Sequence, residues 1–245
     1  MLKRAHRWLI GVVASLGFFV FGSSGAAAQV VVFDQAGMVG VPVNVAVRTT
    51  GLFSAAGGRL VDLELAGEPL GRLMTGADGF GYRRFTPAQA GLLNLEAIAE
   101  GHRASGRLLV LNPTEQAVLI EVETALKAMI WGADGREDCR SALESIGRRY
   151  RLIYISRWLG ADFVRARIAP AGLPETVVLP WKGVATLKSL QHQGVPIAAL
   201  VGSEPAVSEA RSRIDQRFTF EKTRDAILVS RWAEISDRLN SPASH

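Results

Sequence analysis

The sequence predicts a two-domain chain, in which an all-β sandwich is followed by an α/β domain built on a parallel sheet. From Val30 to Asn112, short segments alternate apolar and polar residues with period two and are separated by turn signals, as half-buried strands do. Beyond Asn112-Pro113-Thr114, aliphatic runs alternate with helical patterns, which favours a parallel sheet with helical crossovers. We therefore expect a sandwich over residues 29–112, an α/β domain over residues 113–240 and a tail over residues 241–245.

The first 28 residues have the pattern of a secretory signal peptide. Lys3, Arg4 and Arg7 precede an apolar segment, and small residues ending at Ala28 supply a cleavage site. The apolar segment is shorter than the roughly 20 residues that a membrane-spanning helix needs. We expect cleavage after Ala28, a periplasmic or secreted product and no stable transmembrane segment in that product. An uncleaved amino-terminal anchor is the alternative.

Charge gives no argument for nucleic acid as a partner. The chain has 28 Lys+Arg against 23 Asp+Glu, and the predicted signal peptide holds three of the basic residues and none of the acidic ones. The remainder is nearly balanced and lacks the basic excess of nucleic-acid-binding domains. The single cysteine, Cys139, has no partner for an internal disulfide. No histidine lies near it in the sequence, so we expect an ordinary helix position rather than a reactive thiol.

About seven short strands are expected in the first domain, as in a β-sandwich. They cover Val30–Phe33, Val41–Arg48, Leu60–Leu65, Leu70–Thr75, Phe80–Phe85, Leu92–Ala99 and Arg107–Leu111. The turns and alternation over residues 68–82 and 91–97, with a hairpin signal at Asp78-Gly79, resemble bacterial immunoglobulin-like modules of exported proteins. Such modules space, stiffen or bind. No catalytic set is found here, and His102 is expected to lie in a loop.

The second domain is expected to alternate strands and helices. The strands cover Ala117–Val122, Arg151–Ser156, Thr176–Pro180, Pro196–Val201, Phe218–Phe220 and Ala226–Val229, and the helices Glu137–Tyr150, Leu159–Ile168, Gly183–His192, Ala206–Ile214 and Arg231–Leu239. Two carboxylates, Glu121 and Glu123, fall at the end of the first strand. Open α/β sheets place their sites outside the carboxyl ends of the strands, so this edge is the candidate site.

Four elements carry a family resemblance: Glu121-Val122-Glu123-Thr124 on the first strand, Ser156 at the end of the second, Lys182 before a helix and Gly202-Ser203-Glu204 at the end of the third. Together they make residues 117–239 resemble the haloacid dehalogenase (HAD) superfamily of phosphohydrolases, in particular its lipin and phosphatidate-phosphatase-like branch. The family has Asp-x-Asp-x-Thr at the first motif, Ser or Thr at the second, lysine at the third and Gly-Asp with a further acid at the fourth. Lys188 is a competing candidate for the lysine.

The resemblance implies a role for each position. Glu121 would be the nucleophile that takes the phosphoryl group, and Glu123 the general acid or base. Ser156 and Lys182 would hold the phosphate and neutralise its charge. If the chain were active, Mg²⁺ would be the cofactor, and Glu121 and Glu204 are the metal ligands that the family positions suggest.

The sequence departs from the family where the chemistry lies. Both first-strand aspartates are glutamates, which moves each carboxylate by one methylene, and a misplacement of about 1 Å can cost on the order of 100-fold in rate. Ala125 occupies the threonine position, and Ser203 replaces the metal-binding aspartate. The apolar strands around these positions are retained.

Three interpretations follow. The preferred one is a catalytically impaired pseudophosphatase of the cell envelope, without a cofactor, which binds or scaffolds an unknown protein or a phosphate-containing ligand. The alternative is an active Mg²⁺-dependent hydrolase of phosphatidate or another phosphate ester that uses Glu121 and Glu123. A third is a structural module whose glutamates only solvate the sheet edge. The order of the two domains leaves open whether the sandwich covers that edge.

Overall fold

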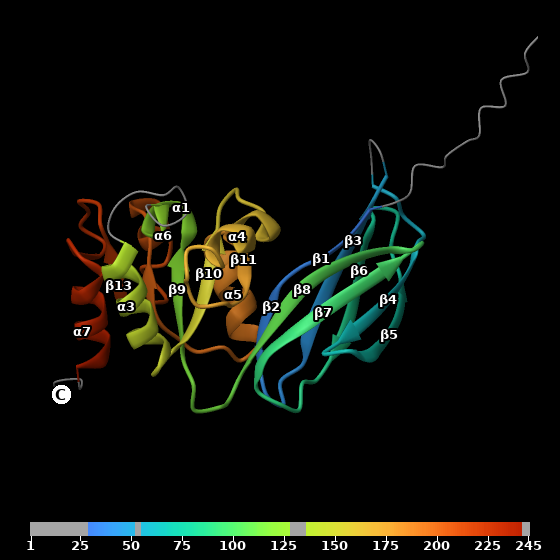
Figure 1. Ribbon diagram of the computed structural model, residues 1–245, viewed down its shortest axis with the longest axis horizontal. Helices are drawn as coiled ribbons and strands as arrows, with labels where there is room; N and C mark the ends of the chain where they lie inside the picture. The colour runs from blue at the N-terminus through green and yellow to red at the C-terminus, as the bar shows by residue number, and fades with distance from the viewer. Residues whose placement is uncertain (1–28, 52–54, 128–135, 242–245) are drawn as a thin grey trace, which may run out of the picture.

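The computed structural model describes residues 29–51, 55–127 and 136–241. Figure 1 shows two units side by side along the long axis of the molecule, a β-sandwich and an α/β unit. The predicted signal peptide and residues 242–245 of the predicted tail lie outside the described residues. Among the residues that are described, no helix is both long and apolar enough to cross a membrane.

The sandwich consists of a three-stranded sheet in the order β1-β3-β6 and a five-stranded sheet in the order β2-β8-β7-β4-β5. Its strands are β1 (Gln29–Val32), β2 (Gln35–Met38), β3 (Val43–Thr50), β4 (Leu60–Leu65), β5 (Glu68–Met74), β6 (Phe80–Phe85), β7 (Gly91–Ala99) and β8 (His102–Leu111). Alternate aliphatic side chains of both sheets form one buried core, as the period-two pattern predicts. The expected all-β sandwich is confirmed.

Two details of the sandwich differ from expectation. Strand β2 has no alternating apolar pattern, and it forms because it pairs in parallel with β8, far away in the sequence. His102 was expected in a loop but is the first residue of β8. The preceding turn is compact, with Glu100 and Gly101 both at positive φ, so the return strand begins at once.

The second unit contains one parallel sheet in the order β11-β10-β9-β12-β13-β14. Its strands are β9 (Ala117–Glu121), β10 (Arg151–Ser156), β11 (Val178–Pro180), β12 (Ile197–Val201), β13 (Gln216–Thr219) and β14 (Ile227–Leu228). The helices are α1 (Val122–Ala125), α3 (Arg136–Gly147), α4 (Ala161–Ile168), α5 (Val184–His192), α6 (Glu204–Glu209) and α7 (Trp232–Asn240). The predicted parallel sheet is therefore confirmed.

Helix α6 ends earlier than the sequence pattern indicates. A helix was expected up to Ile214, but it stops at Glu209 and the chain continues in turns that bond Arg211 to Ser208 and Arg213 to Ala210. Ile214 is nevertheless buried in the same cluster as Ala206 and Val207. The turns keep the apolar residues inward, so the pattern looks helical beyond the end of the helix.

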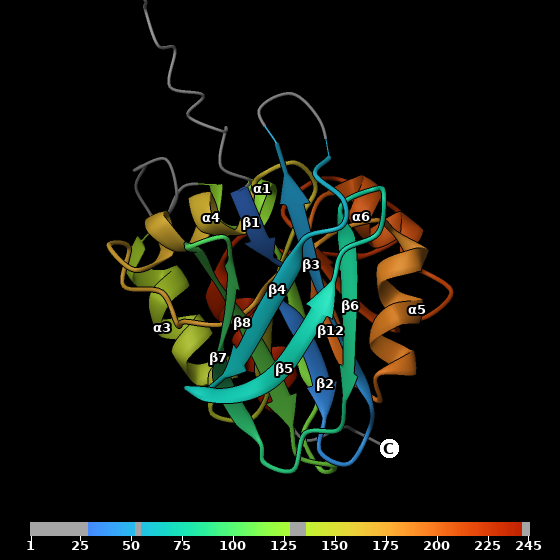
Figure 2. The same ribbon diagram turned by 90° about the vertical axis from the view of Figure 1, so that its right-hand side faces the viewer.

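Both faces of the parallel sheet are covered. Helices α3, α4 and α7 pack on one face, where buried residues of all three join those of β9 and β10 in one apolar cluster. Helices α5 and α6 pack on the other face, together with Ala36, Leu109 and Leu111 of the sandwich. The sandwich thus contributes to the core of the α/β unit, and Figure 2 shows the two units from the sandwich end.

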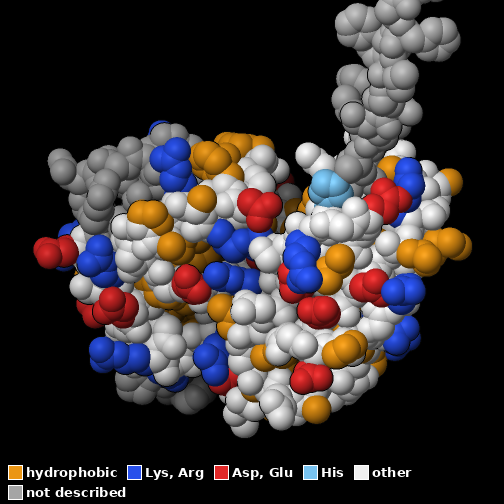
Figure 3. Space-filling view, turned by 45° about the vertical axis from the view of Figure 1, so that its right-hand side comes forward, with side chains coloured by type: hydrophobic (Ala, Val, Ile, Leu, Met, Phe, Trp, Pro, Cys, Tyr) orange, Lys and Arg blue, Asp and Glu red, His pale blue; other side chains and the backbone are white. Residues whose placement is uncertain are grey.

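A buried ion pair joins the two units. The Asp34 side chain, between β1 and β2, is fully buried and lies 2.6 Å from Nη1 of Arg165 in α4. It also accepts the backbone N–H groups of Arg107 in β8, at 2.9 Å, and of Val178 in β11, at 2.8 Å. Strand β11 is at the edge of its sheet as described, and Asp34 supplies a hydrogen-bond partner there in place of a neighbouring strand. On the face shown in Figure 3, basic and acidic side chains are mixed.

Candidate functional site

The candidate site lies at the carboxyl end of β9, where the direction of strand addition reverses. From β9 the sheet extends through β10 to β11 on one side and through β12 to β14 on the other. Doubly wound sheets bind ligands in the crevice outside such a switch point. Glu121 ends β9, and Gly202 and Ser203 follow β12 directly across from it. The structure thus brings Glu121 and Ser203 together, as the strand-end reasoning expected.

Glu121 is held on both sides of its carboxylate. Its side chain is 1% exposed; Oε1 lies 3.0 Å from Nε of Arg157, and Oε2 accepts the backbone N–H of Ser203 at 2.5 Å. A Cβ at position 202 would come within 3.1 Å of the same carboxylate, so glycine makes room for it there. A direct hydrogen bond therefore joins the carboxyl ends of β9 and β12.

The Glu123 carboxylate lies against the turn that follows β10. It belongs to the short helix α1 and is 7% exposed. Its Oε1 accepts the backbone N–H groups of Arg157, Trp158 and Leu159 at 2.9, 3.2 and 3.3 Å, and the Ser156 hydroxyl lies 2.5 Å away. Within the described residues, the buried Oε2 has no hydrogen-bond partner. The structure therefore brings Glu123 and Ser156 together, as two side chains that are hydrogen-bonded to each other.

Arg157 connects the carboxylates of this edge and was missed by sequence reasoning. Its Nε donates to Glu121 and its Nη2 lies 3.2 Å from Oε2 of Glu209 in α6. Glu209 also accepts the indole N–H of Trp181 at 2.8 Å. The sequence position of Arg157 could have indicated a role at the site, because it is the first residue after a buried strand that ends there.

The two lysine candidates are not brought to the carboxylates. Lys182 is exposed in the loop after β11, and its backbone N–H donates to the Thr186 hydroxyl at 2.8 Å. Lys188 is exposed further along α5. In the part of the chain that the structure describes, neither side chain forms an ion pair with Glu121, Glu123 or another acid.

The oxygen atoms at the carboxyl ends of these strands are not arranged as ligands for Mg²⁺. That ion requires several oxygen ligands in near-octahedral geometry, yet the guanidinium of Arg157 occupies the side of Glu121 that faces Glu209. Glu204, the other suggested ligand, is exposed, and its backbone N–H donates to Glu221. No group of three or more His, Cys, Asp or Glu side chains suited to a metal occurs among the described residues.

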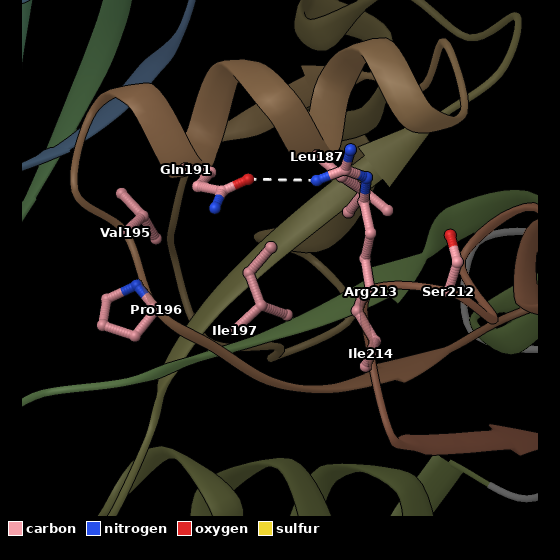
Figure 4. Close-up of a pocket in the computed structure, with 8 residues that line it drawn as sticks. All are labelled: Leu187, Gln191, Val195, Pro196, Ile197, Ser212, Arg213 and Ile214. Atoms are coloured by element: carbon pink, nitrogen blue, oxygen red, sulfur yellow. Dashed lines mark hydrogen bonds between the residues drawn. The ribbon is translucent and has the colours of Figure 1, made fainter.

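A separate cavity lies at the other end of the strands, where their amino ends meet. It measures about 370 Å³ and is lined by Leu187, Gln191, Val195, Pro196, Ile197, Ser212, Arg213 and Ile214. These residues surround the amino end of β12, and Oε1 of Gln191 accepts a hydrogen bond from Arg213 at 3.0 Å (Figure 4). The cavity shares no residue with the carboxylate edge.

Cys139 is expected to be chemically silent in the folded protein. It is buried in α3, and burial, followed by the charge of Asp138, raises the pKa of its thiol to about 12. Only the thiolate reacts with disulfide reagents. We expect negligible labelling by Ellman's reagent at pH 8 in native buffer and one thiol per chain in denaturant. Rapid labelling of the native protein would contradict this.

No protein-family model matches the chain, and no curated protein matches it. Among solved structures, it is similar to a polysaccharide lyase (14% identity, 34% of this chain and 12% of that one, TM-score 0.27). It is also similar to the adhesin InvE of Yersinia pseudotuberculosis (14%, 36% and 33%, TM-score 0.30) and to an IG27 protein domain (13%, 34% and 99%, TM-score 0.27). The chain matches less than two thirds of the length of the first two. At these TM-scores the likenesses add nothing to what the sheets already establish, and the HAD resemblance stays a prediction.

Proposed function

We propose that this chain is an exported, non-catalytic relative of HAD-type phosphohydrolases that acts in the cell envelope by binding. One observation carries the proposal: the two carboxylates at the positions of the family's working acids are both engaged in internal contacts. Glu121 bonds to Arg157 and Ser203, and Glu123 fills the turn after β10. A partner protein or a phosphate-containing ligand is the expected binding target.

The geometry opposes phosphoryl transfer by this pair. An attacking carboxylate must reach phosphorus in line, with reacting atoms about 3–3.5 Å apart. The Glu121 side chain is 1% exposed and pinned between a guanidinium and a backbone N–H, so it points at protein groups. Glu123 is likewise buried; one of its oxygens accepts three backbone N–H groups and lies 2.5 Å from the Ser156 hydroxyl. A general acid or base needs contact with substrate or water, and the buried position of the Glu123 side chain does not provide it.

The test is a phosphatase assay of the purified protein with phosphatidate and an aryl phosphate, with and without Mg²⁺. We expect no turnover above that of the Glu121→Gln variant, because the carboxylate takes no part in chemistry. A trace activity equal in both proteins would come from a contaminant. Turnover that disappears in Glu121→Gln and persists in Glu209→Gln would overturn the proposal in favour of the active hydrolase.

A further inference from the structure

Strand β6 lies at an edge of the three-stranded sheet, and its hydrogen bonds show which of its backbone groups face outward. In the order β1-β3-β6, β3 lies on one side of β6 and no described strand lies on the other. The N–H of Thr49 donates to the C=O of Gly79 at 2.9 Å, which extends the β3–β6 register by one pair. Antiparallel pairs alternate between bonded and non-bonded. The N–H and C=O groups of Phe80, Tyr82 and Arg84 therefore point away from β3.

The contacts of Phe80 agree with this orientation. Its N–H donates to Oδ1 of Asp78 at 3.0 Å, and its C=O accepts the N–H of Gly76 at 2.7 Å, so both groups bond to the preceding turn and not to β3. Within the described residues, the backbone groups of Tyr82 and Arg84 have no such partner. Tyr82 is 65% exposed and Arg84 is also exposed. Strand β6, along one side of the sandwich in Figure 2, therefore offers free donors and acceptors to another strand.

The other edges of the sandwich are less suited to receive a strand. Strand β5 contains Pro69, which has no N–H, and its pairing with β4 is irregular between Leu63 and Glu64. Strand β2 packs against the α/β unit, since Ala36 belongs to the core of that unit. Strand β1 has four residues, against six in β6. The free groups of β6 thus form the most accessible regular edge among the described strands.

The charge of the three-stranded sheet indicates which kind of strand fits. Arg48 of β3 and Arg83 and Arg84 of β6 are its charged residues, and its strands contain no Asp or Glu. Among the described residues, none of these arginines forms an ion pair, whereas the neighbouring sheet pairs Arg72 with Asp62. Like charges on adjacent strands are destabilising. A second copy of β6 is therefore a poor partner for this edge, and an acidic strand is a complementary one.

We propose that the free edge of β6 binds an extended acidic segment of a partner protein, which adds to the sheet as a further strand. The N–H and C=O groups of Tyr82 and Arg84 hold the backbone of the segment, and Arg83 and Arg84 select acidic side chains. A β-branched or aromatic side chain opposite Tyr82 packs against its ring. The inference goes beyond the proposed function and concerns the sandwich alone. Phosphatase turnover by the α/β unit would refute the proposed function and leave this inference standing.

A synthetic peptide tests strand addition on the wild-type protein. The probe is a fluorescent peptide of alternating valine and glutamate, as long as β6, and its binding is followed by fluorescence anisotropy. We expect saturable binding. The same peptide with every backbone nitrogen methylated keeps its charges but has no N–H to donate, so it should not bind. Polygalacturonate, an acidic chain without peptide groups, should not displace the probe. Equal binding of the methylated peptide, or displacement by polygalacturonate, would overturn the proposal.

Two substitutions at position 82 test the edge itself. Tyr82→Pro removes the outward N–H, and because that group takes no part in the β3 ladder, an edge strand tolerates proline there. Tyr82→Ala removes the same ring and keeps the N–H. We expect Tyr82→Pro to abolish peptide binding and Tyr82→Ala to retain it. A folded Tyr82→Pro that binds as tightly as Tyr82→Ala would overturn the proposal. If Tyr82→Pro does not fold, the methylated peptide decides on the wild-type protein.

Charge reversal tests the preference for acidic sequences. Arg84→Glu replaces an attractive cross-strand pair by a repulsive one, so we expect the dissociation constant of the probe to rise on the order of tenfold. Arg148→Glu is the matched control, because it changes the net charge equally at an exposed position after α3. It should leave the dissociation constant unchanged. Equal dissociation constants for the two variants would show that β6 does not select the acidic segment.

Discussion

Replacing Asp34 by alanine is expected to lower the free energy of unfolding by about 3–5 kcal/mol, the usual result of breaking a buried ion pair by removing one partner. Arg165, whose side chain is 15% exposed in the wild type, would keep Asp162 and a backbone carbonyl as its partners among the described residues. The N–H groups of Arg107 and Val178 would also lose their acceptor. Because Asp34 comes from the sandwich and its partners come largely from the α/β unit, the loss should be felt in both.

Tryptophan fluorescence gives a sharp readout, because every tryptophan after residue 28 lies in the α/β half of the sequence. We expect Asp34→Ala to lower the urea midpoint seen by fluorescence, although Asp34 belongs to the other unit. The matched control is Asp62→Ala, which removes an exposed aspartate that pairs with Arg72 inside the sandwich. It should leave the fluorescence midpoint unchanged. Equal midpoints for the two variants would mean that Asp34 does not join the units.

The fold was largely predictable because its strands have unambiguous patterns. The aliphatic run from Val118 to Ile120 and that of β10 are buried on both faces, as parallel strands are, and both were assigned correctly. Strand β2 was not predictable, because Gln35–Met38 pairs with a segment some 70 residues away and has no intrinsic strand pattern. Its structure is imposed by a tertiary contact that a local window does not contain.

The location of the candidate site could be predicted from the sequence, but the hydrogen bonds between its side chains could not. Strand-end reasoning brought Glu121, Glu123, Ser156 and Ser203 to one edge, because the carboxyl ends of parallel strands meet there. It did not reveal that these groups bond to one another, since that depends on side-chain reach and on the path of the turn after Ser156. Arg157 illustrates the limit. Its position after β10 could be predicted from the sequence, whereas its ion pairs with Glu121 and Glu209 depend on the conformation of the long side chain.

Replacing Arg157 by alanine is the second change from which we expect a large effect. It would leave Glu121, 1% exposed, with the Ser203 N–H as its remaining described partner. A buried carboxylate without its cation destabilises the folded state. Because the Arg157 side chain is 24% exposed, we expect the free energy of unfolding to fall by about 2–4 kcal/mol, somewhat less than for a fully buried ion pair. Arg148→Ala, at an exposed position after α3, is the control and should leave the melting temperature unchanged.

A double-mutant cycle separates the ion pair from a general loss of packing. Glu121→Gln should destabilise the wild type, because it leaves the guanidinium without its buried carboxylate. In the Arg157→Ala background the same substitution should be neutral or stabilising, because it removes an uncompensated buried charge. The stability difference between the two backgrounds is therefore the coupling of the pair. An equal effect of Glu121→Gln in both backgrounds would show that Arg157 does not hold Glu121 in place. In that case the carboxylate would be available for other partners, which is the condition that the catalytic alternative requires.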